Sequence, residues 1–230
     1  MDADALHDLG GYFALPVRDA PPDDGGWRTT ESLYAGSALG GLLDVTQERL
    51  ATHERRVAAS ILHQGYAARL WSAALGRTLT GGDVPPLDPE TLWWRTTELS
   101  LVELLLVTPA PSVSAERPAT ERPAAELIAS AVLDRHLDPL ASALRTSTGV
   151  SATILTGNVA SALMGTLRVL AETPLNAAAR ALGGPLLDWP PLRGAGDADL
   201  TASPPTYRRH SCCLFYRVPG GGLCGDCVLA

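Results

Sequence analysis

A helical spacing of apolar side chains marks the first half of the chain. These side chains recur three or four positions apart at Val57, Ile61, Leu62, Tyr66 and Leu70. Such spacing places them on one face of a helix, so we predict a long helix or a helix pair over residues 44–76. Asp44 is a suitable N-cap for this helix, and Gly81-Gly82 ends the pattern.

The same spacing returns in the second half of the chain, at Leu127, Ile128, Ala131, Leu137, Leu140 and Leu144. We predict a helix over 124–145 with a bend before Pro139, because proline removes a backbone donor and crowds the preceding turn. Gly149 separates it from a second helix at about 151–171. Residues 146–167 carry no charge, but Thr, Ser, Gly and Asn occur throughout, which favours a buried helix over a membrane span.

Small side chains form one face of this second helix, because Gly157, Ser161 and Gly165 fall four positions apart. Such a face lets another group approach the backbone closely, and we expect either a neighbouring helix or a ligand there. Helix packing is the simpler interpretation. Asn158 sits beside this face and needs hydrogen-bond partners if it is buried, so a structural role is favoured over ligand contact.

Residues 91–108 follow a different pattern, which predicts two strands about a turn, with a helix as the alternative. Residues 109–123 are rich in proline, serine and charge and indicate a linker or exposed loop. We expect loops with one short helix over 1–43. Residues 174–206 are again rich in Pro and Gly. The expected fold class is mainly α with a small β-sheet (α+β).

Composition and charge narrow the function. The formal charge of −7 argues against a general nucleic-acid binder, so we expect no nucleic acid among the partners. All 18 basic residues are arginine, and the lack of lysine excludes Schiff-base chemistry and a P-loop lysine. The acidic start of the chain is unlike a secretory signal. We therefore expect a cytoplasmic protein without membrane insertion.

Cysteine is confined to the end of the chain. The four cysteines, Cys212, Cys213, Cys224 and Cys227, follow the pattern C-C-x10-C-x2-C within residues 207–230, which we name the cysteine tail. Clustered thiols in a reducing compartment indicate a metal site rather than a disulfide framework. An iron–sulfur cluster and a zinc ion both stay open, and disulfides or free thiols are the remaining alternative.

Positive charge gathers around the first pair of thiols. Arg208, Arg209 and Arg217 occur among residues 207–217 without any acidic residue. Such charge would stabilise the reduced state of an anionic cluster and raise its potential, which favours the iron–sulfur interpretation slightly. A basic surface turn is the alternative explanation.

The order of residues in the cysteine tail is distinctive. Arg208-Arg209 precede Cys212-Cys213, the segment Tyr216-Arg217-Val218-Pro219 follows, and Cys224-Gly225-Asp226-Cys227 completes the pattern. This order resembles the C-terminal motif of the FhuF-like ferric siderophore reductases. Thr156-Gly157-Asn158 resembles a further family motif, and the order of elements agrees with the family over roughly residues 55–230.

The resemblance implies a reductase that binds a [2Fe-2S] cluster through the four cysteines of the tail. It implies one-electron reduction of Fe(III) bound to a siderophore, commonly a hydroxamate, with release of Fe(II). Because no nucleotide-binding motif is present, electrons would come from a ferredoxin or a flavin reductase. We expect substrate or donor docking at Arg208, Arg209, Arg217, His210 and Asn158, and no catalytic residue beyond the cluster.

Three segments are expected on this basis: an unassigned N-terminal segment at 1–54, a helical substrate region at 55–206, and the [2Fe-2S] segment at 207–230. Trp93 and Trp94 would line a substrate cleft or, more simply, belong to the core. Two other functions stay open. One is an iron–sulfur electron carrier without its own substrate site, and the other is a zinc-stapled binding module.

Overall fold

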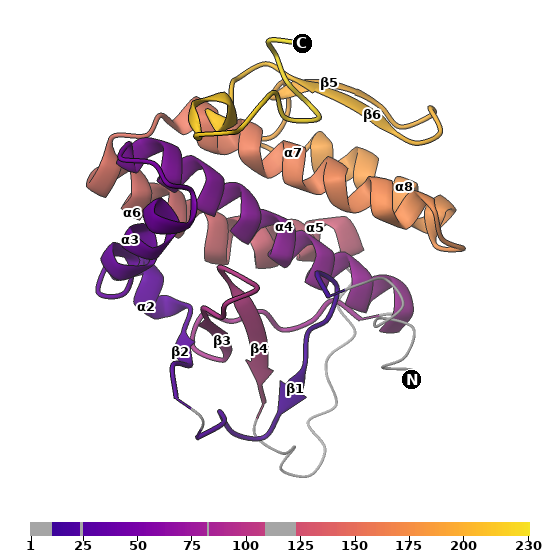
Figure 1. The fold of residues 1–230 in the computed structure, drawn as a ribbon. Helices are drawn as coiled ribbons and strands as arrows, with labels where there is room; N and C mark the ends of the chain where they lie inside the picture. Colours follow the sequence, from indigo (N-terminus) through magenta and orange to yellow (C-terminus); the bar gives the residue numbers. More distant parts are fainter. Residues whose placement is uncertain (1–10, 24, 82, 109–122) are drawn as a thin grey trace.

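The protein is mainly helical with a small mixed sheet, as the sequence predicts (Figure 1). The computed structural model describes residues 11–23, 25–81, 83–108 and 123–230. One hydrophobic core runs through the described part of the chain and joins side chains from Phe13 to Tyr207.

Two helices form the centre of the fold. Helix α4 (Arg55–Gly81) packs along α7 (Ala152–Ala171), and α3 (Leu39–Arg49) precedes α4. The predicted helix over 44–76 is therefore a helix pair that begins earlier than expected. Asp44 is wrong as an N-cap: it lies inside α3, where its carboxylate pairs with Arg55 Nη1 at 2.6 Å. The end of α4 at Gly81 confirms the predicted stop.

The predicted helix over 124–145 is confirmed in outline and is more complex in detail. Helix α5 (Ala124–Ala129) continues into the π-helix η1 (Ser130–Leu137) and then into α6 (Asp138–Thr148). The π-helical stretch ends just before Pro139, where we expected a bend. Gly149 closes α6 with φ 69°, a conformation that glycine adopts without steric cost.

Helix α7 matches its predicted range. Ser151 is the N-cap, and its side chain accepts a hydrogen bond from the backbone N–H of Ile154 at 3.3 Å. By length and composition the helix is apolar enough to cross a bilayer. However, 67% of its most apolar 18-residue stretch is buried inside the fold. It packs against α4 and α8 (Asn176–Leu187), which is the arrangement of a core helix.

The four-stranded sheet has the order β1-β4-β3-β2. Strands β3 (Leu92–Arg95) and β4 (Glu103–Val107) form the predicted antiparallel pair. Strand β2 (Arg28–Thr29) pairs antiparallel with β3, and β1 (Val17–Arg18) pairs parallel with β4.

Residues 11–43 were expected to be loops with one short helix, and they contain more structure than that. Besides β1 and β2 they hold α2 (Glu31–Tyr34) and the beginning of α3. Leu33 and Leu43 are fully buried in the common core, so this segment is part of the same packed unit.

The Pro- and Gly-rich segment 174–206 contains regular structure. This segment forms helix α8 and strand β5 (Gly196–Asp199), which pairs antiparallel with β6 (Thr206–Arg209). The glycines of α8 let it approach α7: a Cβ on Gly183 would lie 2.6 Å from Leu167 Cδ1. Gly183 therefore allows close helix packing and does not form a turn.

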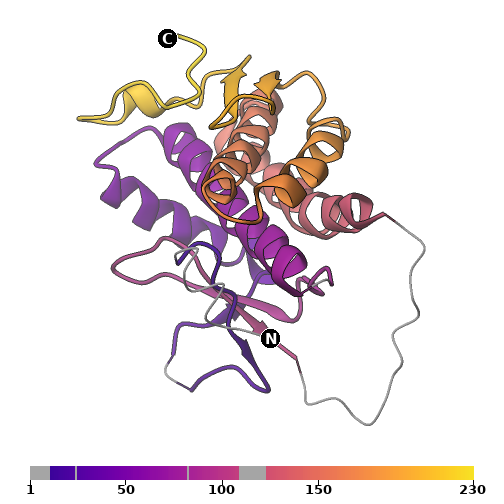
Figure 2. The ribbon, with the colours of Figure 1, turned by 90° about the vertical axis from the view of Figure 1, so that its right-hand side faces the viewer.

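The helices separate the two β-structures. Figures 1 and 2 both show the four-stranded sheet on one side of α4 and α7, with β5, β6 and the end of the chain on the other. The short 3-10 helix η2 (Phe215–Arg217) belongs to this second side. Of the linker predicted at 109–123, residues 109–122 lie outside the described residues, and α5 begins directly after Pro123.

Candidate metal centre

The two cysteine segments lie on neighbouring stretches of the chain, joined by a hydrogen bond from the end of β6. The backbone N–H of Arg209 donates to the carbonyl of Asp226 at 3.1 Å, which places Cys224-Gly-Asp-Cys227 beside the strand that leads into Cys212-Cys213. All four thiols are free; Cys213 and Cys227 are buried, and the other two are half-buried.

The thiols of Cys213 and Cys224 are in contact. Burial, followed by the hydrogen bond and the charge of Cys213, raises the pKa of Cys224 to about 12. Within the described residues no three Cys, His or acidic side chains are gathered closely enough to hold a metal ion. The structure thus brings together two of the four predicted ligands and leaves Cys212 and Cys227 outside this pair.

Backbone N–H groups already point at the sulfurs. The N–H of Leu214 donates to Cys212 Sγ at 3.3 Å, and that of Leu229 donates to Cys227 Sγ at 3.4 Å. A backbone hydrogen bond from Asp226 to Cys224 partly opposes the rise in the pKa of that thiol. Leu214 reaches its position with φ 68°, an uncommon conformation for leucine. Such donors stabilise thiolates and metal-bound sulfur.

The first cysteine pair is attached to α4. Ser60 Oγ donates to the carbonyl of Cys213 at 2.7 Å. Asn158 Nδ2 in turn donates to the carbonyl of Ser60 at 2.8 Å, so the attachment is braced from α7. Ser60 and Asn158 are fully buried, which shields these bonds from water.

The second cysteine pair is attached to α7 through Asp226, which lies between Cys224 and Cys227. Its two carboxylate oxygens accept hydrogen bonds from different side chains, one from the Arg168 guanidinium and the other from the Ser161 hydroxyl. Asp226 is only 6% exposed, so this carboxylate is a buried anchor.

Arg209 lies in the interior between the two attachments. Its Nη2 donates to Asn158 Oδ1 at 2.7 Å and to the carbonyl of Ile154 at 3.3 Å. Gly157 makes the space: a Cβ there would lie 2.2 Å from Ser211 Oγ and 2.8 Å from Arg209 Nη2. At this end, the small-residue face is therefore covered by the cysteine tail, and the expectation of a helix or a ligand at Gly157 is wrong.

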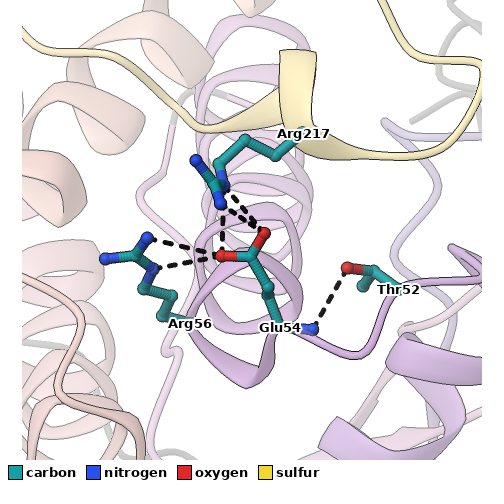
Figure 3. Close-up of polar contacts among 4 residues, drawn as sticks. All are labelled: Thr52, Glu54, Arg56 and Arg217. Carbon is teal, nitrogen blue, oxygen red and sulfur yellow. Dashed lines mark hydrogen bonds and ion pairs between the residues drawn. The ribbon is translucent and has the colours of Figure 1, made fainter.

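A third attachment lies at the surface (Figure 3). Arg217 of η2 donates from Nε to both carboxylate oxygens of Glu54, at 2.8 and 3.1 Å. Glu54 directly precedes α4 and also accepts from Arg56. The hydrogen bond from Arg217 is the main cause that lowers the pKa of Glu54.

This C-terminal geometry coincides with a known family. Residues 209–229 match the FhuF 2Fe-2S C-terminal domain. The match confirms the resemblance noted in the tail and supports a [2Fe-2S] cluster as the cofactor. No curated protein matches the chain.

The residues of the cysteine tail fit such a group. Four free thiols match the thiolate ligands that iron–sulfur clusters take, and backbone N–H groups face Cys212, Cys224 and Cys227. Arg209 Nε is buried and has no hydrogen-bond partner in the described structure. A negatively charged group beside it would supply the missing electrostatic partner.

A cleft of about 670 Å³ opens between α4 and α7 against the cysteine tail. Gln64 and Gly65 line it from α4, Ser161 and Gly165 from α7, and Cys213 and Cys224 from the tail. Among its described lining residues, the charged ones are Arg168 and Asp226, which form an ion pair with each other. The cleft is thus largely apolar, electrically balanced and in contact with two thiols.

The docking residues expected from the sequence divide into two groups. Arg208, His210 and Arg217 are exposed. Arg209 and Asn158 are fully buried and bonded to each other, so neither can meet an incoming molecule from the surface.

Among the exposed residues, Arg208 Nη2 donates to the carbonyl of Ala230 at 2.8 Å. His210 binds Asp197 at 3.0 Å, and this hydrogen bond is the main cause that raises the pKa of His210. Trp94 is buried in the core, and neither it nor Trp93 lines the cleft.

Sequence reasoning missed Ser60, Ser161 and Asp226 as anchors of the tail. Asp226 had a visible signal, because it is the acidic residue between two thiols in a basic segment. Ser60 had none: a serine within an apolar helix is ordinary, and only the fold brings it to Cys213.

Proposed function

We propose that the protein is a ferric siderophore reductase. The observation that carries the proposal is the cleft, because its wall contains Cys213 and Cys224 of a tail that matches a 2Fe-2S domain. A molecule in this cleft lies against the redox centre. The volume falls within the range of about 300–1,000 Å³ that is usual for small-molecule sites.

In this proposal Cys212, Cys213, Cys224 and Cys227 hold the [2Fe-2S] cluster. The bound cluster supplies a single electron at the cleft wall. A ferredoxin or a flavin reductase delivers that electron from outside, and Fe(III) of the siderophore accepts it and becomes Fe(II). Oxygen chelators hold Fe(III) far more tightly than Fe(II), so reduction weakens the complex and the iron leaves.

The charge of the cleft favours a neutral ferric complex. Three singly charged hydroxamates cancel the charge of Fe(III), whereas a tris-catecholate complex keeps a surplus of negative charge. The ion pair of Arg168 and Asp226 offers no net positive charge to such a surplus. Burial of an uncompensated charge in an apolar cleft is costly, so we propose a hydroxamate-type substrate.

We assign the cluster and the substrate cleft to different segments of the chain. We propose residues 207–230 as the redox segment and 55–206 as the region that builds the cleft. Of the segment 1–54, the described residues complete the core and, through Tyr12 and Phe13, one edge of the cleft. Because the four thiols are free and thiols stay reduced in the cytoplasm, we propose a cytoplasmic location.

The proposed function is tested with the anaerobically purified holoprotein. After chemical reduction, it is mixed with a ferric trihydroxamate, a ferric tris-catecholate or ferric citrate in the presence of a ferrous trap. We expect saturable oxidation of the protein by the trihydroxamate, with about one Fe(II) released per electron stored, and slower, unsaturable reaction with the other two. Equal, unsaturable rates with all three complexes would favour the electron carrier.

A variant of the cleft provides the matched control. Gly165 lines the cleft, and a Cβ there would meet no atom within 4 Å, so Gly165→Val adds apolar bulk to the cleft wall. We expect the KM for the trihydroxamate to rise severalfold at an unchanged reduction potential. An unchanged KM would show that the substrate binds elsewhere.

A further inference from the structure

Arg209 is a buried cation without an anionic partner. Its side chain has no exposed surface, and its hydrogen bonds go to neutral acceptors: Asn158 Oδ1, the carbonyl of Ile154, Gln64 Oε1 at 3.4 Å and Ser211 Oγ at 3.5 Å. Its Nε has no partner, and no described carboxylate forms an ion pair with it. A buried charge is destabilising unless it is paired.

The other two arginines of the tail differ from Arg209. Arg208 is exposed and donates to the carbonyls of Val228 and Ala230 at the chain end. Arg217 is exposed and neutralised by Glu54, whose carboxylate lies 2.7 Å from its Nη2. Of these three cations, Arg209 alone is both buried and uncompensated.

Arg209 also lies close to both cysteine segments. Its backbone N–H bonds to Asp226, between Cys224 and Cys227. On the other side, its guanidinium binds Asn158, which binds Ser60, which binds the carbonyl of Cys213. The guanidinium is therefore linked to the first cysteine pair through buried side chains, and the backbone of the same residue is bonded to the second cysteine segment. The charge of Arg209 also acts on Cys224, whose pKa it lowers against the larger effect of burial.

We propose that Arg209 is the internal counter-charge of the cluster and the tail arginine that most strongly raises its reduction potential. The inference rests on the proposed cofactor. Four thiolate ligands leave a [2Fe-2S] cluster negatively charged, and reduction adds one more negative charge. A fixed buried cation nearby favours the reduced state, and solvent ions screen it far less than they screen Arg208.

The test compares holoproteins of the wild type and of Arg209→Gln, with Arg208→Gln and Arg217→Gln as matched controls. Potentials are measured by titration with redox dyes at about 50 mM and 1 M salt, near the limits of weak and strong screening. For Arg209→Gln we expect the equilibrium to move about tenfold towards the oxidised form, which is about 59 mV, at both salt concentrations. The controls should shift less, and their shifts should shrink at high salt.

Gln64→Glu tests the uncompensated charge without any cluster. It gives Arg209 a carboxylate at nearly unchanged side-chain volume. We expect the apoprotein melting temperature to rise in the wild-type background and to fall in the Arg209→Gln background, because only the first contains the cation. This comparison also decides the matter if Arg209→Gln assembles no cluster.

The proposal is overturned if Arg209→Gln shifts the potential no more than Arg208→Gln, if its shift disappears at high salt, or if Gln64→Glu fails to stabilise the apoprotein. Dye titration needs no siderophore, so a holoprotein that behaves as expected here yet reduces no ferric siderophore refutes the proposed function alone. A wild-type protein that binds no cluster refutes both.

Discussion

Substitution of Gly157 by alanine tests how closely the cysteine tail is seated on α7. The added Cβ would lie 2.2 Å from Ser211 Oγ and 2.8 Å from Arg209 Nη2, closer than real Cβ contacts. Neither neighbour moves freely. Ser211 Oγ donates to the carbonyl of Thr153 at 3.0 Å, and Arg209 is fixed by its bond to Asn158.

The magnitude follows from two opposing effects. Alanine is favoured over glycine in a helix interior by about 1 kcal/mol. Overpacking costs about 1–3 kcal/mol, and displacement of Arg209 loses a charged hydrogen bond of about 1.5–3 kcal/mol. The net expectation is a destabilisation of roughly 1.5–5 kcal/mol, together with weaker retention of the cluster.

Gly165→Ala is the matched control, because Gly165 lies two helical turns away on the same face and its Cβ would meet no atom within 4 Å. We expect this variant to gain up to about 1 kcal/mol from helix propensity. The assay is denaturant unfolding of the apoproteins, with iron content of the holoproteins as a second readout. If Gly157→Ala is as stable as Gly165→Ala, the tail is not seated on Gly157 as described.

Three more predictions concern the tail. Single replacement of Cys212, Cys213, Cys224 or Cys227 by serine should each reduce or alter the cluster spectrum, because the chain holds only these four cysteines; an unchanged spectrum would remove that residue from the ligand set. Asp226→Asn should cost about 1–3 kcal/mol in urea unfolding, because a buried charged acceptor is lost, and Ser161→Ala, which removes one of its two donors, should cost less. Because its hydrogen bond to Asp197 raises the pKa of His210 above 6.5, this pair stabilises the fold fully below pH 6.5 and stops doing so as pH rises through the raised pKa; NMR titration should show that pKa lowered in Asp197→Asn, and an equal pKa in both proteins would contradict the contact.

The regular elements could be predicted because local patterns determine them. The spacing of apolar side chains in α4 and α7 and the β3–β4 pair are properties of consecutive residues. Helix α8 escaped prediction because its sequence contains Gly183 and Pro185, residues typical of turns. In the fold Gly183 is in the helix because Leu167 of α7 packs against it, a contact between distant parts of the chain.

In the candidate site, too, local sequence predicts some features and contacts between distant residues determine the others. The confinement of the cysteines to one short segment indicated a metal site, and the surrounding order of residues indicated the family. From the sequence, the three tail arginines could not be distinguished, because arginine is usually exposed. Only the fold distinguishes them: Arg209 enters the space above Gly157 and meets Asn158, which lies 51 residues earlier in the chain.

The attachments of the tail explain why so large a helical body accompanies so short a redox segment. Cys213 is fixed to Ser60 of α4, and the Cys224–Cys227 segment is fixed through Asp226 to Ser161 and Arg168 of α7. The relative position of the two cysteine pairs is therefore set by the packing of α4 against α7. The same two helices form the floor of the cleft. A change in their packing would move the cysteine pairs and the cleft together, so the geometry that would hold the cluster also sets its distance from a substrate in the proposed site.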